Sequence, residues 1–197
     1  MAEATDTPTA ILSHAAEALR ECPFDDISYR ALGDAVGVSE RTVYRHFPTR
    51  SHLLEGVAGW VESTVFPLPP FVTIPEFREA SRARFAAFDA SPAFAFVCAR
   101  AAAISPTGEP EPTPFTRVLV AMLDASFPST NARDLRRVAA SLRYFASAQF
   151  WARMRTGFEM SAPAMADVFE RTVSQVLDEL AGPTDVQIDR PRGRVSG

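Results

Sequence analysis

Residues 28–50 constrain the fold of this chain more than any other stretch, because they predict two short helices joined by a tight turn. Ser28 supplies a side-chain oxygen that can cap a first helix, and apolar residues then recur at helical spacing. Gly37 can take the left-handed conformation that ends a helix, because it has no Cβ atom. Ser39 can cap a second helix, and Pro48 ends it.

The second of these helices is expected to present hydrogen-bonding and cationic side chains outward. Val43 and Phe47 are spaced to face inward. The outward set is Arg41, Thr42, Tyr44, Arg45 and His46. A helix of this kind fits the major groove of DNA, where such groups can pair with base edges. Although the net charge of the chain is −4, residues 41–52 contain three arginines, two histidines and no carboxylate.

The same stretch resembles the DNA-binding helix-turn-helix of the TetR family of bacterial transcriptional regulators. Val36-Gly37-Val38-Ser39 corresponds to Ala-Gly-Val-Ser in the family pattern, Arg41-Thr42-Val43-Tyr44 to Gly-Thr-Leu-Tyr, and His46-Phe47 is identical. Arg41 departs from the pattern, since it places a long cation where the family has a small residue. The resemblance covers about the first quarter of the chain. It implies a DNA-binding set of Ser28, Tyr29, Ser39, Arg41, Thr42, Tyr44, Arg45, His46 and Arg50, with Arg50 on a flanking phosphate.

Helical periodicity continues along the chain and predicts an all-α fold with about nine helices. An N-terminal three-helix head, residues 9–56, is followed by a helical ligand-binding and dimerisation domain, residues 57–182. Residues 1–8 and 183–197 are expected to be disordered. The further helices are predicted over residues 9–21, from about 49, and over 75–90, 92–104, 114–127, 131–156 and 162–181, with an apolar, non-helical connector at 66–71.

The last two predicted helices indicate a homodimer. The helix over 131–156 is apolar almost all round between 138 and 154, and the helix over 162–181 carries a wide apolar stripe. Two such helices can form a four-helix interface with a second copy, and TetR-like proteins dimerise through their last two helices. The predicted interface residues are Phe150, Met154, Met165, Phe169, Val173, Val176 and Leu177.

The chain contains fifteen phenylalanines, most of them in the second domain. A well-filled aromatic core explains them, and a ligand cavity lined by aromatic rings is the alternative. The cavity interpretation gives a lining of Phe85, Phe88, Phe96, Arg100, Met122, Phe145, Gln149 and Arg153. Its effector would be small and largely apolar or aromatic, with few charges.

Several classes of protein are disfavoured by what the sequence lacks. We find no apolar run long enough to span a bilayer and no secretory signal, which predicts a cytoplasmic protein without membrane contact. The chain has no glycine-rich phosphate loop, no metal-spaced histidines and no nucleophile elbow, which predicts no enzyme activity, no cofactor and no metal. Cys22 and Cys98 are interpreted as small buried residues, with a thiol sensor at Cys98 as the alternative.

The sequence therefore favours a ligand-responsive repressor that binds a palindromic, double-stranded operator as a dimer and is released by a small-molecule effector. Two alternatives stay open. One is a DNA-binding regulator without small-molecule input, and the other is a helical adaptor that binds protein rather than DNA. The operator sequence, the effector and any DNA contact by the arginine-containing tail are left undetermined.

Overall fold

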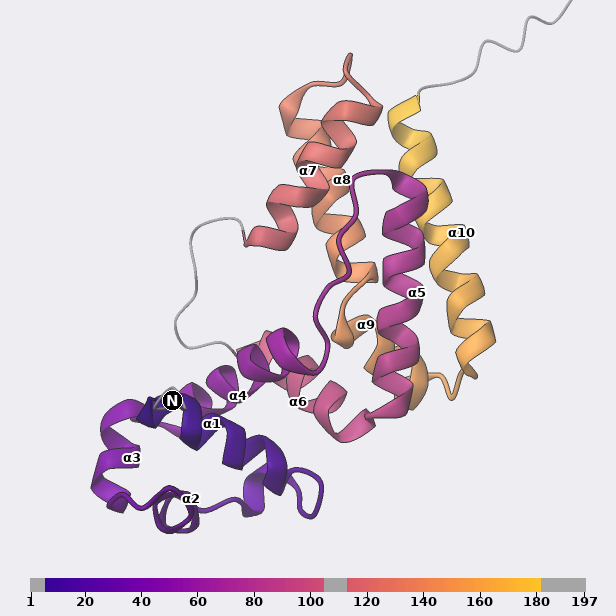
Figure 1. Ribbon diagram of the computed structural model, residues 1–197. Helices are drawn as coiled ribbons and strands as arrows, with labels where there is room; N and C mark the ends of the chain where they lie inside the picture. The colour runs from indigo at the N-terminus through magenta and orange to yellow at the C-terminus, as the bar shows by residue number, and fades with distance from the viewer. Residues whose placement is uncertain (1–5, 105–112, 182–197) are drawn as a thin grey trace, which may run out of the picture.

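The computed structural model describes residues 6–104 and 113–181, and the regular structure in this part of the chain is entirely helical (Figure 1). The all-α prediction is thereby confirmed. The elements are α1 Thr7–Ala18, a 3₁₀ turn Phe24–Asp26, α2 Tyr29–Val36, α3 Glu40–His46, α4 Arg50–Thr64, α5 Ile74–Ala90, α6 Pro92–Ile104, α7 Pro114–Ser126, α8 Ala132–Phe145, α9 Ala148–Ala152, a π-helical turn Arg153–Gly157 and α10 Ala162–Ala181.

Two groups of helices are evident in Figure 1. We call α1, α2, α3 and the first half of α4 the head, and the remainder of the described chain the C-terminal domain. The second half of α4 runs from the head into the C-terminal domain, where it packs against α6. Between α4 and α5 the chain is not helical, and Phe66 and Phe71 are buried there, as predicted for a packed connector.

Side-chain caps begin α2 and α3 at the predicted residues. The hydroxyl of Ser28 accepts a hydrogen bond from the Ala31 amide, and the hydroxyl of Ser39 accepts one from the Thr42 amide. Thr49 caps α4 in the same way. Gly37 has φ 72° and ends α2 in the left-handed conformation, which confirms its predicted role.

The corner between α2 and α3 also depends on Gly33, whose role the sequence did not indicate. A Cβ atom on Gly33 would lie 2.7 Å from the carbonyl oxygen of Val38, which is backbone and has little freedom to move away. The absence of a side chain therefore lets the two helices of the corner approach each other closely.

We expect Gly33→Ala to lower the free energy of unfolding by about 1–3 kcal/mol, because the added methyl group overpacks the corner. Gly59→Ala is the matched control, since a Cβ atom there meets nothing within 4 Å. In α4 this change should raise stability by about 0.5–1 kcal/mol through helix propensity. Urea unfolding monitored by circular dichroism measures both. If both variants changed the free energy of unfolding in the same direction, the close approach at Gly33 would be contradicted.

The prediction of one long helix over 131–156 is wrong, because the helix is interrupted at Ala146 and Ser147. Ala146 leaves helical geometry, with φ −91° and ψ 10°. The Ser147 hydroxyl then caps α9 by accepting a hydrogen bond from the Phe150 amide. After α9 the backbone winds into the π-helical turn. These two departures from α-helical geometry change which side chains of the segment face the core.

The N-terminal boundary also differs from the prediction. Asp6 caps α1 through the amide of Thr9, so Thr7 and Pro8 are helical rather than disordered. The first helix ends at Ala18 instead of residue 21. The other residues predicted to be disordered, 1–5 and 183–197, lie outside the described residues.

Across 6–104 and 113–181, no single helix is long and apolar enough to cross a bilayer, although α5 and α6 taken together pass that test across a 114° bend. No group of three or more His, Cys, Asp or Glu side chains in these two ranges is placed to hold a metal ion.

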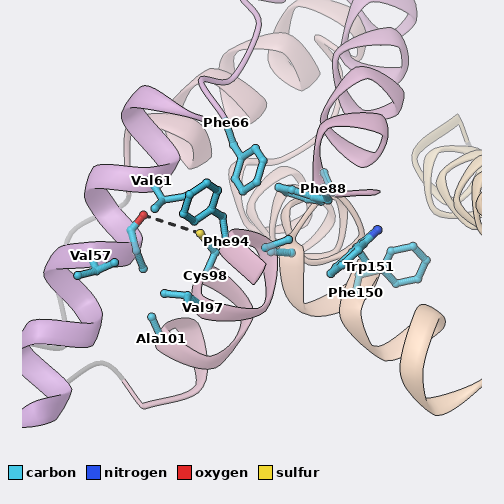
Figure 2. Close-up of a cluster of buried hydrophobic side chains, with 14 of the residues drawn as sticks. Val57, Val61, Phe66, Phe88, Phe94, Val97, Cys98, Ala101, Phe150 and Trp151 are labelled. Carbon is cyan, nitrogen blue, oxygen red and sulfur yellow. Dashed lines mark hydrogen bonds between the residues drawn. The ribbon is translucent and has the colours of Figure 1, made fainter. Parts of the chain in front are cut away.

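The core of the C-terminal domain is built around α6 (Figure 2). One side of α6 packs against α4, where Val57 and Val61 are buried, and another packs against α9, where Trp151 is buried. Phe88 of α5 lies between these layers, edge-on to Phe66 and to Trp151. Because α6 contacts both α4 and α9, it connects the helix that enters the head with the C-terminal part of the chain.

Candidate nucleic-acid interface

The helix α3 presents three large polar side chains to solvent. Arg41 and Arg45 are exposed, and Tyr44 has 51% of its surface accessible. Val43 lies on the opposite side and is fully buried in the head, as its spacing predicted. The helix is therefore fixed through its apolar side while guanidinium and phenol groups point outward. Thr42 and His46 are half-buried at the edges of this surface.

Ser39 and Thr42 are already engaged with each other at the start of α3. Their hydroxyl oxygens lie 3.0 Å apart, and the Ser39 oxygen also accepts from the Thr42 amide at 3.2 Å. Ser39 therefore holds the first turn of the helix, which is the capping role that the sequence predicted. Ser28 is likewise exposed and engaged in capping α2.

Tyr29, predicted to contact DNA, is instead buried with 5% of its surface accessible. Its ring packs 4.4 Å from the ring of Tyr44, centroid to centroid, so Tyr29 supports the exposed tyrosine from behind. Its hydroxyl has no hydrogen-bond partner among the described residues, and burial raises the pKa of this phenol. The contribution of Tyr29 to this surface is therefore indirect.

Arg50, predicted to bind phosphate, has its guanidinium directed inward. The guanidinium donates hydrogen bonds to the carbonyl oxygens of Phe24 and Ile27 and lies over the Phe24 ring, 4.4 Å from its centroid. This placement corrects the expectation that Arg50 binds phosphate. Its two terminal nitrogens, which could donate to a phosphate, donate instead to two carbonyl oxygens before α2. Arg50 thus holds the 3₁₀ turn against α4.

This placement predicts different effects for two arginines of the head. Arg50→Met should lower the free energy of unfolding by about 1.5–3 kcal/mol, since it removes charge-assisted hydrogen bonds to two carbonyls. Arg45→Met, at an exposed position, should change stability by less than about 0.5 kcal/mol. Thermal unfolding measures both. If Arg50 bound phosphate instead, Arg50→Met would leave stability unchanged and lower the salt dependence of DNA binding by about one contact.

Comparison with known proteins agrees with this geometry. The family model for bacterial regulatory proteins of the tetR family matches residues 11–57, which extend from α1 into α4. These residues contain the capped corner and the exposed helix α3 described above.

The head of the chain, over residues 11–57, matches the TetR family.

Individual proteins are also similar to this chain. Nucleoid occlusion factor SlmA from Marinomonas sp. (strain MWYL1) is 39% identical over 61 residues, and SlmA from Alteromonas mediterranea is 37% identical over 62 residues. The matched stretches span about a third of this chain and of each relative (31% and 32%). A TetR transcriptional regulator from Rhodococcus sp. RHA1 shares the fold with a TM-score of 0.64, over 88% of this chain and 98% of that chain, at 16% identity.

Outside the TetR head, the eight residues predicted to bind a ligand are dispersed. Phe85, Phe88 and Met122 are buried in the core, while Phe145 and Gln149 are half-buried. Arg153 is exposed, with its guanidinium carbon 5.7 Å from the centroid of the Phe158 ring. The remaining two line surface hollows. Phe96 and Arg100 line a hollow of about 420 Å³, and Phe96 also lines one of about 370 Å³.

The residues predicted to form the dimer interface mostly face their own protomer. Five of the seven are buried within the single chain: Phe150, Met165, Phe169, Val173 and Leu177. The ring of Phe169, for example, packs edge-on against Phe85 at 5.2 Å between centroids. Because these side chains already contribute to the core, their assignment to an interface is corrected. Met154 and Val176 are half-buried and stay available.

Sequence reasoning missed Arg84, the one charged side chain that is buried among the described residues, with 7% of its surface accessible. Its guanidinium lies 3.7 Å from the carboxylate of Glu62 and over the Phe88 ring, and its Nε has no hydrogen-bond partner in the described ranges. Desolvation lowers its pKa. The signal was present in the sequence, because residue 84 falls on the apolar stripe of α5 with Phe77, Ser81 and Phe88.

Cys98 lies in the buried cluster shown in Figure 2 and is near enough to Arg84 to interact with its charge. Its sulfur faces the carbonyl oxygen of Ala58 at 3.8 Å. Burial, reinforced by the negative charge of Glu62, raises the pKa of the thiol to about 12. A thiol with this pKa is protonated at neutral pH, and oxidation requires the thiolate. The environment thus favours the interpretation of Cys98 as a buried apolar residue over a redox sensor.

Proposed function

We propose that this TetR-family DNA-binding regulator acts in the cytoplasm as a homodimer, binds a palindromic operator through α3 of each protomer, and represses transcription until a small-molecule effector releases it. The observation that carries the DNA-binding part is the exposed surface of Arg41, Tyr44 and Arg45 on a helix held by the Ser39 cap and the Gly37 corner. Arginine can pair with the O6 and N7 atoms of guanine in the major groove.

Selection from a random duplex library, followed by fluorescence anisotropy with the enriched sequence, tests this proposal. A palindromic consensus with sub-micromolar affinity is expected, since a two-fold dimer reads two matching half-sites. Absence of any enriched duplex would favour the protein-binding adaptor. Enrichment of an asymmetric site that one protomer occupies would contradict binding as a dimer. It would still support DNA binding through α3.

The dimer part of the proposal is supported by side chains that the protomer core leaves uncovered. The helices α8 and α10 pack against each other. On α8, Tyr144 has 48% of its surface accessible. On α10, Val168 and Val176 are half-buried against the core. Exposed aromatic side chains are enriched at interfaces, and a second copy would cover them.

We expect Val176→Asp to weaken the dimer by about 2 kcal/mol or more, because it places an unpaired carboxylate in the interface. Analytical ultracentrifugation at micromolar concentration should then shift from dimer toward monomer. Val72→Asp is the matched control, since Val72 is 73% exposed in the connector between α4 and α5. A wild-type protein that sediments as a monomer, or equal effects of the two variants, would contradict the proposed interface.

The effector part of the proposal is supported by the aromatic composition of the C-terminal domain and by the position of α6. This helix contacts α4, which enters the head, and its residues line both surface hollows. A ligand that displaces α6 can therefore alter the head through a packed element. It must bind the DNA-incompetent arrangement more tightly, since equal affinity for both arrangements shifts nothing. Operator affinity that no small molecule changes would favour the regulator without small-molecule input.

A further inference from the structure

The larger surface hollow, about 420 Å³, lies where the head meets the C-terminal domain. Its walls come from residues 19–23, which follow α1, from the 3₁₀ turn and from α6. Leu19, Phe24 and Phe96 contribute apolar surface, and the rim includes Arg20 and Arg100. Phe96 has 40% of its surface accessible, which is unusual for a phenylalanine in the middle of a packed helix. The hollow is thus apolar at its walls and carries guanidinium groups.

One of these guanidinium groups already holds a carboxylate. Arg100 pairs with Asp25 through two parallel contacts, 2.8 Å between Nη1 and Oδ2 and 3.0 Å between Nη2 and Oδ1. The hydrogen bond from Arg100 lowers the pKa of Asp25 below its usual value. Both side chains are substantially exposed to solvent. An exposed ion pair of this kind contributes little net stability, so another carboxylate can exchange with Asp25 at small cost.

The same turn is connected to the helix-turn-helix. Arg100 and Arg50 both approach the Phe24 ring, with their guanidinium carbons 5.8 and 4.4 Å from its centroid. Arg50 also binds the carbonyl of Ile27, the residue before the Ser28 cap of α2. The Asp25–Arg100 pair therefore joins α6 directly to the turn that positions α2. Loss of this pair would leave the turn attached to α4 through Arg50 but released from α6.

We propose that the hollow at the head–domain junction binds a small aromatic carboxylate, which replaces Asp25 on Arg100 and places its ring against Phe24 and Phe96. The exchange conserves the charge around Arg100, because one carboxylate leaves the guanidinium as another arrives. Burial of the aromatic ring supplies the favourable free energy. Asp25 then returns to water. This inference deepens the proposed function by naming a site and a chemical class for the effector, and it depends on that function only for the effect on DNA.

Isothermal titration calorimetry of the full chain without DNA tests the site, with 2-naphthoate as the probe and 2-naphthamide as its uncharged counterpart. We expect saturable 2-naphthoate binding and at least tenfold weaker binding of the amide. Arg100→Gln should weaken 2-naphthoate at least tenfold. Asp25→Asn should tighten it by about fivefold, because the internal competitor is removed. Arg82→Gln is the charge-matched control on α5, where Arg82 pairs with Glu170 away from the hollow, and it should leave binding unchanged.

The opposite signs expected for Arg100→Gln and Asp25→Asn distinguish carboxylate exchange from a purely structural ion pair. Failure of Asp25→Asn to bind 2-naphthoate at millimolar concentration would overturn the proposal, as would unchanged binding to Arg100→Gln. Operator affinity is then measured with and without 2-naphthoate. Binding that follows the expected pattern but leaves operator affinity unchanged would support the site and contradict effector control of DNA binding.

Discussion

Phe169→Ala is expected to lower the free energy of unfolding by about 3–5 kcal/mol, the range for removing a buried aromatic ring. Phe169 has no accessible surface in the single chain, and its ring contacts those of Phe77 and Phe85 on α5. The substitution leaves a cavity between α5 and α10 that the backbone of two helices can close only in part. Chemical unfolding monitored by circular dichroism measures the loss.

Phe158→Ala is the matched control, because it removes the same ring from a position with 57% of its surface accessible. Its effect on folding should stay below about 1 kcal/mol. The pair also separates two interpretations of α10. If Phe169 faced a second protomer, as its place on an apolar stripe suggested, Phe169→Ala would give a stably folded monomer. That outcome would contradict its burial in the core of its own protomer.

Local signals in the sequence were sufficient for the head. Ser28, Ser39 and Thr49 each bind the amide three residues further along the chain, and Gly37 adopts a conformation that its own lack of a Cβ atom permits. Such interactions depend on residues that are neighbours in sequence. Gly33 was missed because its constraint comes from the carbonyl of Val38, across the corner.

Interactions between distant segments could not be predicted in the same way. The acceptors of Arg50 lie 23 and 26 residues earlier in the chain, so the sequence showed a cation beside the helix-turn-helix without showing what it binds. The stripe of α10 has the same periodicity whether it faces its own core or a partner. The break at Ser147 was missed because Ala146, Ser147 and Ala148 are all compatible with a continuous helix.

The joint substitution of Arg41 and Arg45 by alanine is expected to weaken operator binding by about two orders of magnitude or more, since each arginine that pairs with a base contributes roughly 1–3 kcal/mol. Both residues are exposed, one turn apart on α3. Within residues 6–104 and 113–181, no hydrogen bond or ion pair engages either guanidinium, in contrast to Arg50. Their replacement should therefore leave the free energy of unfolding almost unchanged. Anisotropy titrations over a salt series, with the selected operator and a scrambled duplex, measure the effect.

Arg82 and Arg133 provide a control with the same change of charge, because both are exposed on helices of the C-terminal domain. Their joint replacement by alanine should reduce affinity for DNA only through weak, long-range electrostatics that salt screens.

The single variants of Arg41 and Arg45 separate sequence reading from phosphate binding. If Arg41 pairs with a guanine, Arg41→Ala should lose discrimination at one base pair in each half-site, whereas loss of a phosphate contact weakens operator and scrambled duplex alike and lowers the salt slope by about one. Wild-type affinity of the double variant at every salt concentration would mean that another surface of the head meets DNA, because a helix that fills the major groove cannot lose both of its outward cations without a measurable cost.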